Sequence, residues 1–401
     1  MAQTLGAREA LIQNHIRNIH LIFLVLVLVV AAMFSGPPTL ASTPQTTSIS
    51  VSTLKSAPTT SWSWGYNGYG QLGDASNTNK NILAQESTNA TDWSSIAAGS
   101  HHTVALKSNG TLWAWGSGAR GQLGNGTNAN TNVPNQESTW AANWSEIAVG
   151  ETHTVALKSD GTLWAWGKNG YGQLGDGTNS NRNGPTQEST AATNWSAITA
   201  GGGHTVGLKS NGTLWAWGRG SSGQLGDGRN ANGNIPIQES TAATDWSAIA
   251  AGFGHTVALK SDGTLWSWGA NWNGQLGDGT NIQKPTPTQE LTAATNWSAI
   301  AAGSGHTVGL KSDGTLWAWG NNGKGQIGDG TNKDKHTPTQ ESTEATNWSS
   351  ITAGSGHTAG LKSDSTLWAW GWNHLGQLGD GTNTDRKIPT QESTASGNWS
   401  Y

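Results

Sequence analysis

The chain has 401 residues, including 56 glycines and 24 tryptophans but no cysteine, which excludes disulfides and thiolate metal sites. Charged residues make up only 11% of the chain, the formal net charge is −4, and the lysines and arginines form no cluster. Proteins that bind the phosphates of nucleic acids usually carry a basic face, so we expect no nucleic-acid partner.

The first feature in chain order is an uninterrupted apolar run, LIFLVLVLVVAAMF, at residues 21–34. It follows Arg8 and Arg17 and precedes small residues up to Ala41, a pattern typical of a signal peptide. The run is short for a transmembrane helix, which needs about 20 apolar residues. We therefore expect residues 1–41 to be a signal peptide and the protein to be exported, to a periplasm, the cell surface or the medium. The alternative is a membrane anchor formed by residues 20–41, and only then do we expect contact with a membrane.

The rest of the chain repeats one unit without insertion or deletion. The second tryptophan of the WxWG motif recurs at a fixed interval, which from Trp64 to Trp115 is 51 residues, and the tryptophan of the NWS or DWS motif recurs at the same interval. The fold class is therefore best inferred from the repeat rather than from any single segment.

Within one unit, four short segments have the composition of β-strands. They are residues 144–150, 152–159, 162–167 and 184–189, separated by glycine, by Asp160-Gly161 and by the loop GQLGDGTN. Asp-Gly between apolar segments predicts a hairpin with a type I′ turn, and the DGTN part of the loop predicts an Asx turn rather than a calcium site. Four strands per repeat predict an all-β, seven-bladed β-propeller of 51-residue repeats, with four short antiparallel strands in each blade.

The ends of the chain together supply one unit. After Trp399 only Ser400 and Tyr401 remain, so the residues that complete this last unit are expected from positions 45–63. The domain would then span residues 42–401, and its N-terminal strands would close the ring and leave no free sheet edge.

Two repeated residue types are expected to be structural. Both faces of the strands are largely apolar, so we expect the tryptophans to pack between neighbouring blades. The histidine that recurs once per unit stands without a second ligand at metal spacing, which indicates a structural hydrogen bond and no metal. These residues are Trp64, Trp115, Trp166, Trp217, Trp268, Trp319 and Trp370, with His102, His153, His204, His255, His306 and His357.

The copies differ mainly in the loop that follows each WxWG motif. Equivalent positions in a ring lie on one face, and these loops carry aromatic and basic residues of the types enriched at binding hot spots. The candidate partner-binding residues are Tyr66, Tyr69, Arg120, Lys168, Tyr171, Arg219, Trp272, Lys324, Trp372 and His374. Unconstrained drift of loop sequences is the alternative explanation.

The motif HTVALKSDGTLWAWG followed by GQLGDGT resembles the repeat of the regulator-of-chromosome-condensation family over nearly all of residues 45–401. This resemblance implies a seven-bladed propeller. It also implies three kinds of activity: guanine-nucleotide exchange on a small nuclear GTPase through a protruding insertion, light sensing by clustered tryptophans, and, in a secreted bacterial relative, inhibition of β-lactamases by an aromatic-rich face. Here no unit carries an insertion, and the tryptophans occupy repeat-invariant positions.

The sequence contains no catalytic set, phosphate-binding loop or dinucleotide motif, so we expect neither enzyme activity nor a cofactor. We expect an exported, non-enzymatic, monomeric propeller that binds another protein through its variable loops, with a glycan as the alternative partner. Guanine-nucleotide exchange on a small GTPase is the alternative function.

Overall fold

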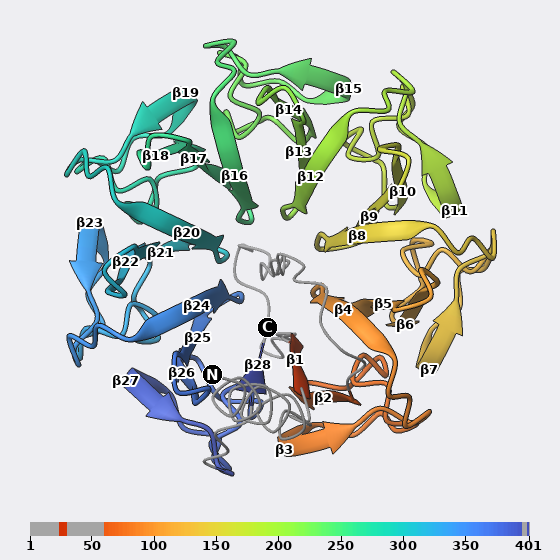
Figure 1. The fold of residues 1–401 in the computed structure, drawn as a ribbon, viewed down its shortest axis with the longest axis horizontal. Helices are drawn as coiled ribbons and strands as arrows, with labels where there is room; N and C mark the ends of the chain where they lie inside the picture. The colour runs from red at the N-terminus through yellow and green to blue at the C-terminus, as the bar shows by residue number, and fades with distance from the viewer. Residues whose placement is uncertain (1–23, 30–59, 395–398, 401) are drawn as a thin grey trace, which may run out of the picture.

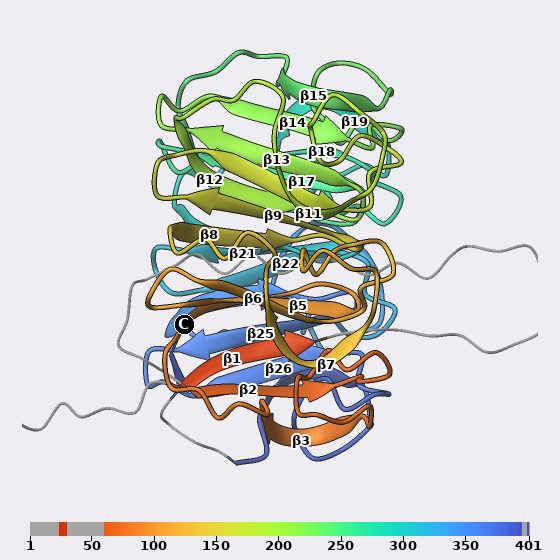
Figure 2. The ribbon, with the colours of Figure 1, turned by 90° about the vertical axis from the view of Figure 1, so that its right-hand side faces the viewer.

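The fold is built from small four-stranded sheets arranged around a central axis (Figure 1). The computed structural model describes residues 24–29, 60–394 and 399–400. These residues contain strands and loops only, and they include no helix that could cross a membrane. The prediction of an all-β propeller is confirmed, and in side view the sheets stack as the blades of one disc (Figure 2).

Six sheets are antiparallel throughout, and each takes four consecutive strands from one repeat. The strands nearest the axis begin at the tryptophan of the NWS or DWS motif: β4 (Trp93–Ala98), β8 (Trp144–Val149), β12 (Trp195–Ala200), β16 (Trp246–Ala251), β20 (Trp297–Ala302) and β24 (Trp348–Ala353). The second strands begin at the repeated histidine: β5 (His102–Lys107), β9 (His153–Lys158), β13 (His204–Lys209), β17 (His255–Lys260), β21 (His306–Lys311) and β25 (His357–Lys362).

The third strands hold the WxWG motif: β6 (Leu112–Gly116), β10 (Leu163–Gly167), β14 (Leu214–Gly218), β18 (Leu265–Gly269), β22 (Leu316–Gly320) and β26 (Leu367–Gly371). The outer strands are β7 (Thr131–Gln136), β11 (Arg182–Gln187), β15 (Gly233–Gln238), β19 (Lys284–Gln289), β23 (Lys335–Gln340) and β27 (Arg386–Gln391). Each predicted segment of a unit is therefore a strand, with boundaries shifted by a few residues.

The hairpin between the second and third strands is present, but the type I′ turn was a wrong prediction. Leu157 pairs with Leu163, which leaves a longer connection than the two-residue loop that a type I′ turn requires. The amide of Gly161 donates to the carbonyl of Lys158 at 2.9 Å, and only Gly161 has a positive φ, of 77°. This is a type I turn closed by a left-handed glycine, so the aspartate before it keeps ordinary geometry.

Hydrophobic clusters lie between neighbouring blades, because each sheet has two apolar faces. In one cluster Leu112 and Ala114 of β6 pack against Trp144 of β8 and Trp166 of β10, and all four side chains are buried. The indole Nε1 of Trp166 also donates to the backbone oxygen of Gln122, in the preceding blade, at 3.0 Å. Packing of the second WxWG tryptophan between blades is thus confirmed.

The first tryptophan of each WxWG motif is only half-buried. Trp164 lies next to the hairpin, where its Nε1 donates to Thr162 Oγ1 at 3.0 Å and the ammonium of Lys158 lies 4.3 Å from its ring centroid. Its ring still packs against the cluster that holds Trp144 and Trp166. The equivalent residues Trp113, Trp215, Trp266, Trp317 and Trp368 pack against such clusters in the same way.

The repeated histidines are fully buried, and five of them make the predicted hydrogen bond across a blade junction. His153 Nε2 lies 3.1 Å from Thr205 Oγ1, which itself donates to the carbonyl of Gln173 at 2.7 Å. Because that hydroxyl proton is already used, His153 Nε2 must donate and therefore carries a proton. Burial lowers the pKa of His153 to about 3, so the ring is neutral at neutral pH. For His357, the position in register is Ser52, which lies outside the described residues.

The remaining sheet differs from the other six and joins the two ends of the chain. Its order is β28 (Trp399–Ser400), β1 (Leu24–Val29), β2 (Thr60–Gly65) and β3 (Lys80–Gln85), and β1 pairs in parallel with both β2 and β28. The repeat predicts an antiparallel strand here from residues 45–63. Only residues 60–63 of that range are described, as part of β2. The segment that pairs with β2 instead is β1, whose sequence alternates leucine and valine.

The two ends also meet at the junction with the last antiparallel blade. The indole Nε1 of Trp64, in β2, donates to the backbone oxygen of Gln377 at 3.1 Å, and Trp64 is buried with Leu367 and Leu378. The contact that joins successive blades therefore also joins the first WxWG motif to the last repeat.

Candidate partner-binding surface

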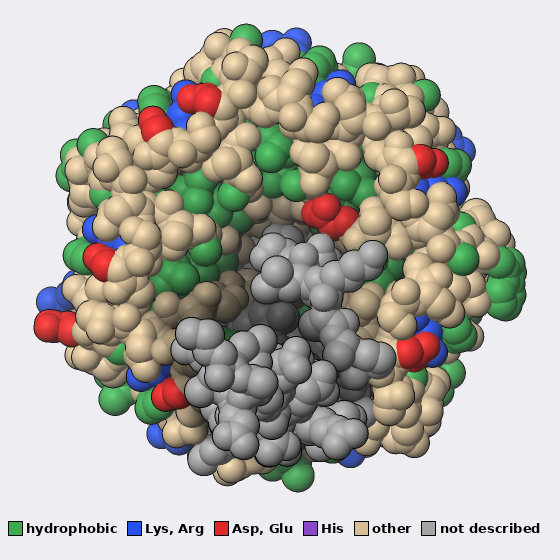
Figure 3. Space-filling model, in the orientation of Figure 1, with side chains coloured by type: hydrophobic (Ala, Val, Ile, Leu, Met, Phe, Trp, Pro, Cys, Tyr) green, Lys and Arg blue, Asp and Glu red, His purple; other side chains and the backbone are tan. Residues whose placement is uncertain are grey.

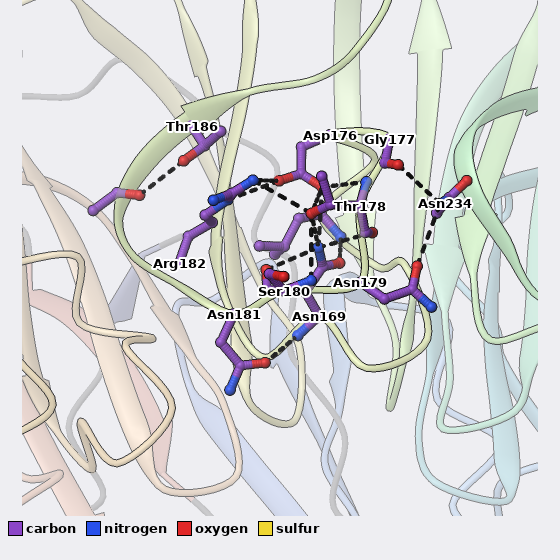
Figure 4. Close-up of polar contacts among 12 residues, drawn as sticks. Asn169, Asp176, Gly177, Thr178, Asn179, Ser180, Asn181, Arg182, Thr186 and Asn234 are labelled. Atoms are coloured by element: carbon purple, nitrogen blue, oxygen red, sulfur yellow. Dashed lines mark hydrogen bonds and ion pairs between the residues drawn. The ribbon is translucent and has the colours of Figure 1, made fainter.

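Five of the variable loops between third and outer strands are held in place by an asparagine, whereas the loops that carry Arg120 and Arg219 have Gly118 and Gly220 at that position. Asn169 Nδ2 donates to Asp176 Oδ1 at 3.0 Å and to the carbonyls of Thr178 and Ser180, while its Oδ1 accepts from the amide of Leu174 (Figure 4). Buried hydrogen bonds of this kind fix the loop backbone. The side chains on the loop are therefore presented by a rigid support.

The DGTN part of the same loop forms the predicted Asx turn. Asp176 Oδ1 accepts from the amide of Thr178 at 2.9 Å and from its hydroxyl at 2.8 Å, and Arg182 pairs with Asp176 at 2.7 Å (Figure 4). The carboxylate is thus occupied by groups of its own loop.

Three of the predicted binding residues meet in one cluster that spans two blades. The ammonium of Lys168 lies 5.5 Å from the ring centroid of Tyr171, and the guanidinium of Arg219 lies 5.6 Å from the same centroid. Arg219 also lies 5.7 Å from the ring of Phe253, which comes from the loop between β16 and β17 in a third blade. We call the surface formed by these loops the loop face.

Sequence reasoning missed Phe253 and a second member of this cluster, Glu151. Both occupy one repeat position, in the loop between the first and second strands, where the other copies have serine or glycine. That departure from the repeat was the available signal. Burial raises the pKa of Glu151 above its ordinary value although Lys168 and Arg219 attract its charge, so the two cations do not fully compensate the loss of water.

A second aromatic group lies on the loops of the first repeat. The rings of Tyr66 and Tyr69 meet edge to face with centroids 6.2 Å apart, and His101 lies 4.9 Å from Tyr69. Burial lowers the pKa of His101 to about 4, so this cluster is uncharged at neutral pH. Sequence reasoning identified the two tyrosines but not the histidine beside them.

The last two repeats bring three further predicted residues together. The ring centroids of Trp372 and His374 are 6.1 Å apart, and Asp385 lies 3.6 Å from His374 and 3.9 Å from Lys324. Lys324 is thus engaged with a carboxylate of the neighbouring repeat, which leaves it less available to an acidic partner than a free lysine.

The two remaining candidates differ in their surroundings. Trp272 is 59% exposed and lines a small hollow with Arg219 and Phe253. Arg120 lines a polar groove of about 420 Å³ with Arg182 and Asn183. Trp272 therefore extends the Lys168–Phe253 cluster within the blade of Phe253, whereas Arg120 lines no aromatic group.

Charge is sparse on the face seen in Figure 3. Hydrophobic side chains gather around the central opening, where one acidic group also lies, and the other charged side chains occur singly or in small groups toward the rim (Figure 3). Among the described residues, no group of three or more histidine, aspartate or glutamate side chains could hold a metal ion.

Comparisons with known proteins identify the repeat. A family model described as "RCC1-like domain" matches residues 142–399, and the "Regulator of chromosome condensation (RCC1) repeat" matches residues 61–106 and 109–157. The chain belongs to the RCC1 family. The resemblance inferred from the repeat motif is confirmed.

Among relatives, the ultraviolet-B receptor UVR8 of Arabidopsis thaliana is 33% identical over 302 residues, covering 74% of this chain and 69% of the receptor. The mitochondrial RCC1 domain-containing protein RUG3 of the same plant is 32% identical over 300 residues, covering 71% of this chain and 66% of that protein. Proteins of the RCC1 family are regulators and binding proteins rather than classical enzymes.

Solved structures share the fold at low identity. Prp20p of Saccharomyces cerevisiae, whose binding to Gsp1p and histones has been described, has a TM-score of 0.72 at 22% identity, covering 87% of this chain and 86% of the yeast chain. Human WBSCR16 has a TM-score of 0.73 at 19% identity, covering 87% and 94%. At these identities the likeness supports the propeller fold alone.

Proposed function

We propose that this chain is an exported, non-enzymatic propeller that binds a protein partner through its loop face, as a monomer. The observation that carries the proposal is the arc of Lys168, Tyr171, Arg219, Phe253 and Trp272, contributed by consecutive blades. Aromatic rings and arginine on rigid loops are the residues that dominate protein interfaces. A protein is favoured over a glycan because the cations are stacked on the rings and leave less open aromatic surface for a sugar.

We further propose that the mature protein has seven blades and begins near Ser42. Removal of residues 1–41 would remove β1 from its place between β2 and β28. Residues 48–54, SISVSTL, would then pair antiparallel with β2, as the second strand does in the other repeats. If residues 20–41 are retained as an anchor, only a few residues separate the membrane from the propeller.

A capture experiment tests the binding proposal. Substituting Tyr171, Trp272 and Trp372 together by alanine should abolish capture of a partner from native extract while the protein stays folded, with some loss of melting temperature because Trp372 packs against the cluster of Leu367 and Leu378. The matched control is Trp140→Ala, because Trp140 is 71% exposed but lies on an outer turn away from the loop face. Equal capture by the triple variant and the parent would contradict the proposal.

Guanine-nucleotide exchange on a small GTPase is the second candidate, because the chain belongs to the RCC1 family. The equal length of all units argues against it, because the family's exchange activity uses a protruding insertion. An exchange assay with the purified protein separates the two: acceleration of nucleotide release would favour the exchange function.

A further inference from the structure

A small hollow lies on the loop face where three consecutive blades meet. It has a volume of about 30 Å³ and is lined by Arg219, Gln224, Phe253, Trp272, Gln275 and Ser304, among others. A cavity needs roughly 10–15 Å³ by this kind of measure to hold one water molecule. The hollow therefore admits the end of a side chain, such as a carboxylate, and is too small for a sugar ring or a nucleotide.

One hydrogen-bond donor in the wall of the hollow has no acceptor. Gln224 is 1% exposed, and its Oε1 accepts from the amide of Ser222 at 2.9 Å, which fixes the orientation of the side-chain amide. Its Nε2 has no partner. A buried donor without an acceptor is destabilising, so a ligand oxygen at this point would be stabilised.

The same amide is also unpartnered at Gln71, Gln173 and Gln377, and two repeats in which it is satisfied indicate why. The equivalent Gln122 donates to Ser117 Oγ at 3.3 Å, and Gln326 donates to Asn321 Oδ1 at 2.6 Å. Arg219 occupies the repeat position of Ser117 and Asn321. The replacement removes a neutral acceptor from Gln224 and places a cation beside the hollow.

The guanidinium of Arg219 is held in place without an ion pair to any described carboxylate, although Glu151 lies near enough to interact with its charge. Its Nε donates to Ser221 Oγ at 3.0 Å, and it lies between the rings of Tyr171 and Phe253. By contrast, Arg182, Arg229 and Arg386 each form an ion pair with an aspartate of their own loop.

We propose that this hollow is a carboxylate-binding site, which takes the side chain of a glutamate or aspartate from a protein partner. Arg219 and Gln224 would donate to the two carboxylate oxygens, since a planar guanidinium suits a planar carboxylate. Phe253 and Trp272 would pack against apolar residues that flank the acidic side chain. The inference rests on the proposed protein-binding function and names the chemistry of the partner.

Binding of a defined peptide to the full-length protein tests the inference. The probe is acetyl-Ala-Leu-Glu-Leu-Ala-amide, and its counterpart with glutamine in place of glutamate is the reference. With arginine labelled by ¹⁵N, the Nε–H signal of Arg219 can be assigned by its loss in Arg219→Gln. We expect the glutamate peptide to shift this signal and to bind about ten-fold or more tightly than the glutamine peptide, as a charge-assisted hydrogen bond implies.

Variants separate the site from general electrostatic attraction. Arg219→Gln and Gln224→Ala should each weaken binding of the glutamate peptide, whereas Arg229→Gln should not, although it removes the same charge from an outer loop. Equal loss in Arg219→Gln and Arg229→Gln would overturn the inference. The comparison of the two peptides on the unmodified protein needs no variant, so equal affinities would overturn it as well.

A titration with inorganic phosphate tests whether the hollow binds phosphate rather than a carboxylate. If phosphate shifts the Arg219 signal at concentrations about ten-fold below those of the glutamate peptide, the site is a phosphate site and the assignment to carboxylate is wrong. Capture from native extract is scored independently. Loss of capture with preserved peptide binding would reject the proposed function and leave the carboxylate site standing.

Discussion

Acidification should destabilise this propeller through the buried histidines at the blade junctions. His102, His153, His204, His255 and His357 have their pKa lowered to about 3 and His306 to about 4, in every case chiefly by burial. In the unfolded chain these rings have a pKa of about 6.5. The native state therefore excludes protons that the unfolded state binds, and stability must fall as the pH falls below about 6.5.

The magnitude follows from the folded and unfolded pKa values. At pH 5.5 an unfolded histidine is mostly charged while the buried one is still neutral, which costs about 1.4 kcal/mol of unfolding free energy per ring relative to neutral pH. Six rings give roughly 8 kcal/mol, a large part of the usual 5–15 kcal/mol stability of a protein. His101 adds to this loss, and Glu146, whose pKa burial raises to about 7, opposes part of it.

Urea unfolding followed by tryptophan fluorescence at pH 7.5, 6.5 and 5.5, at constant ionic strength, measures this effect. The unfolding free energy should drop steeply below pH 6.5, and His204→Gln should reduce the slope by about one proton. An unfolding free energy that stays constant or increases down to pH 5.5 would refute neutral burial of these rings.

Three further predictions follow from single positions. Gly201→Ala should destabilise the protein by about 3 kcal/mol or prevent folding, because the added Cβ would lie 2.3 Å from the carbonyl oxygen of Gly252. Thermal melting checks this against the control Gly170→Ala, where the added Cβ meets nothing within 4 Å. Equal melting temperatures of the two variants would contradict the close packing at Gly201. Glu146→Gln should stabilise the protein at pH 8 by up to about 3 kcal/mol and have little effect near pH 4.5, because burial destabilises the carboxylate only once it ionises. Denaturant titrations of the variant and the parent at both pH values test this. An equal change in unfolding free energy at the two pH values would contradict the raised pKa of Glu146. Deleting residues 45–60 should lower the melting temperature and broaden unfolding of the whole protein, as calorimetry would show, whereas parental melting would refute closure by this segment.

The sequence by itself determined the repeat, the strands and the packing between blades. Fixed spacing from Trp64 to Trp370 places every unit in the same register, and the apolar character of both faces of β9 and β10 requires a neighbour on each side. These properties are local: a blade pairs strands that are adjacent in sequence, so hydrogen bonds and side-chain alternation follow from short segments. The repeated histidines were also recognisable, since a lone histidine in an apolar strand has few roles other than a hydrogen bond.

Only the tertiary structure decided what the loops bring together. Phe253 lies beside Arg219 because the loop between the first two strands of one blade reaches the variable loop of the blade before it, and no pattern within one repeat specifies that distance. The free amide of Gln224 is likewise visible only when the side chain at position 219 is placed beside it. Periodicity determines what all copies share, whereas a binding site arises where neighbouring copies differ, and that requires contacts across blades.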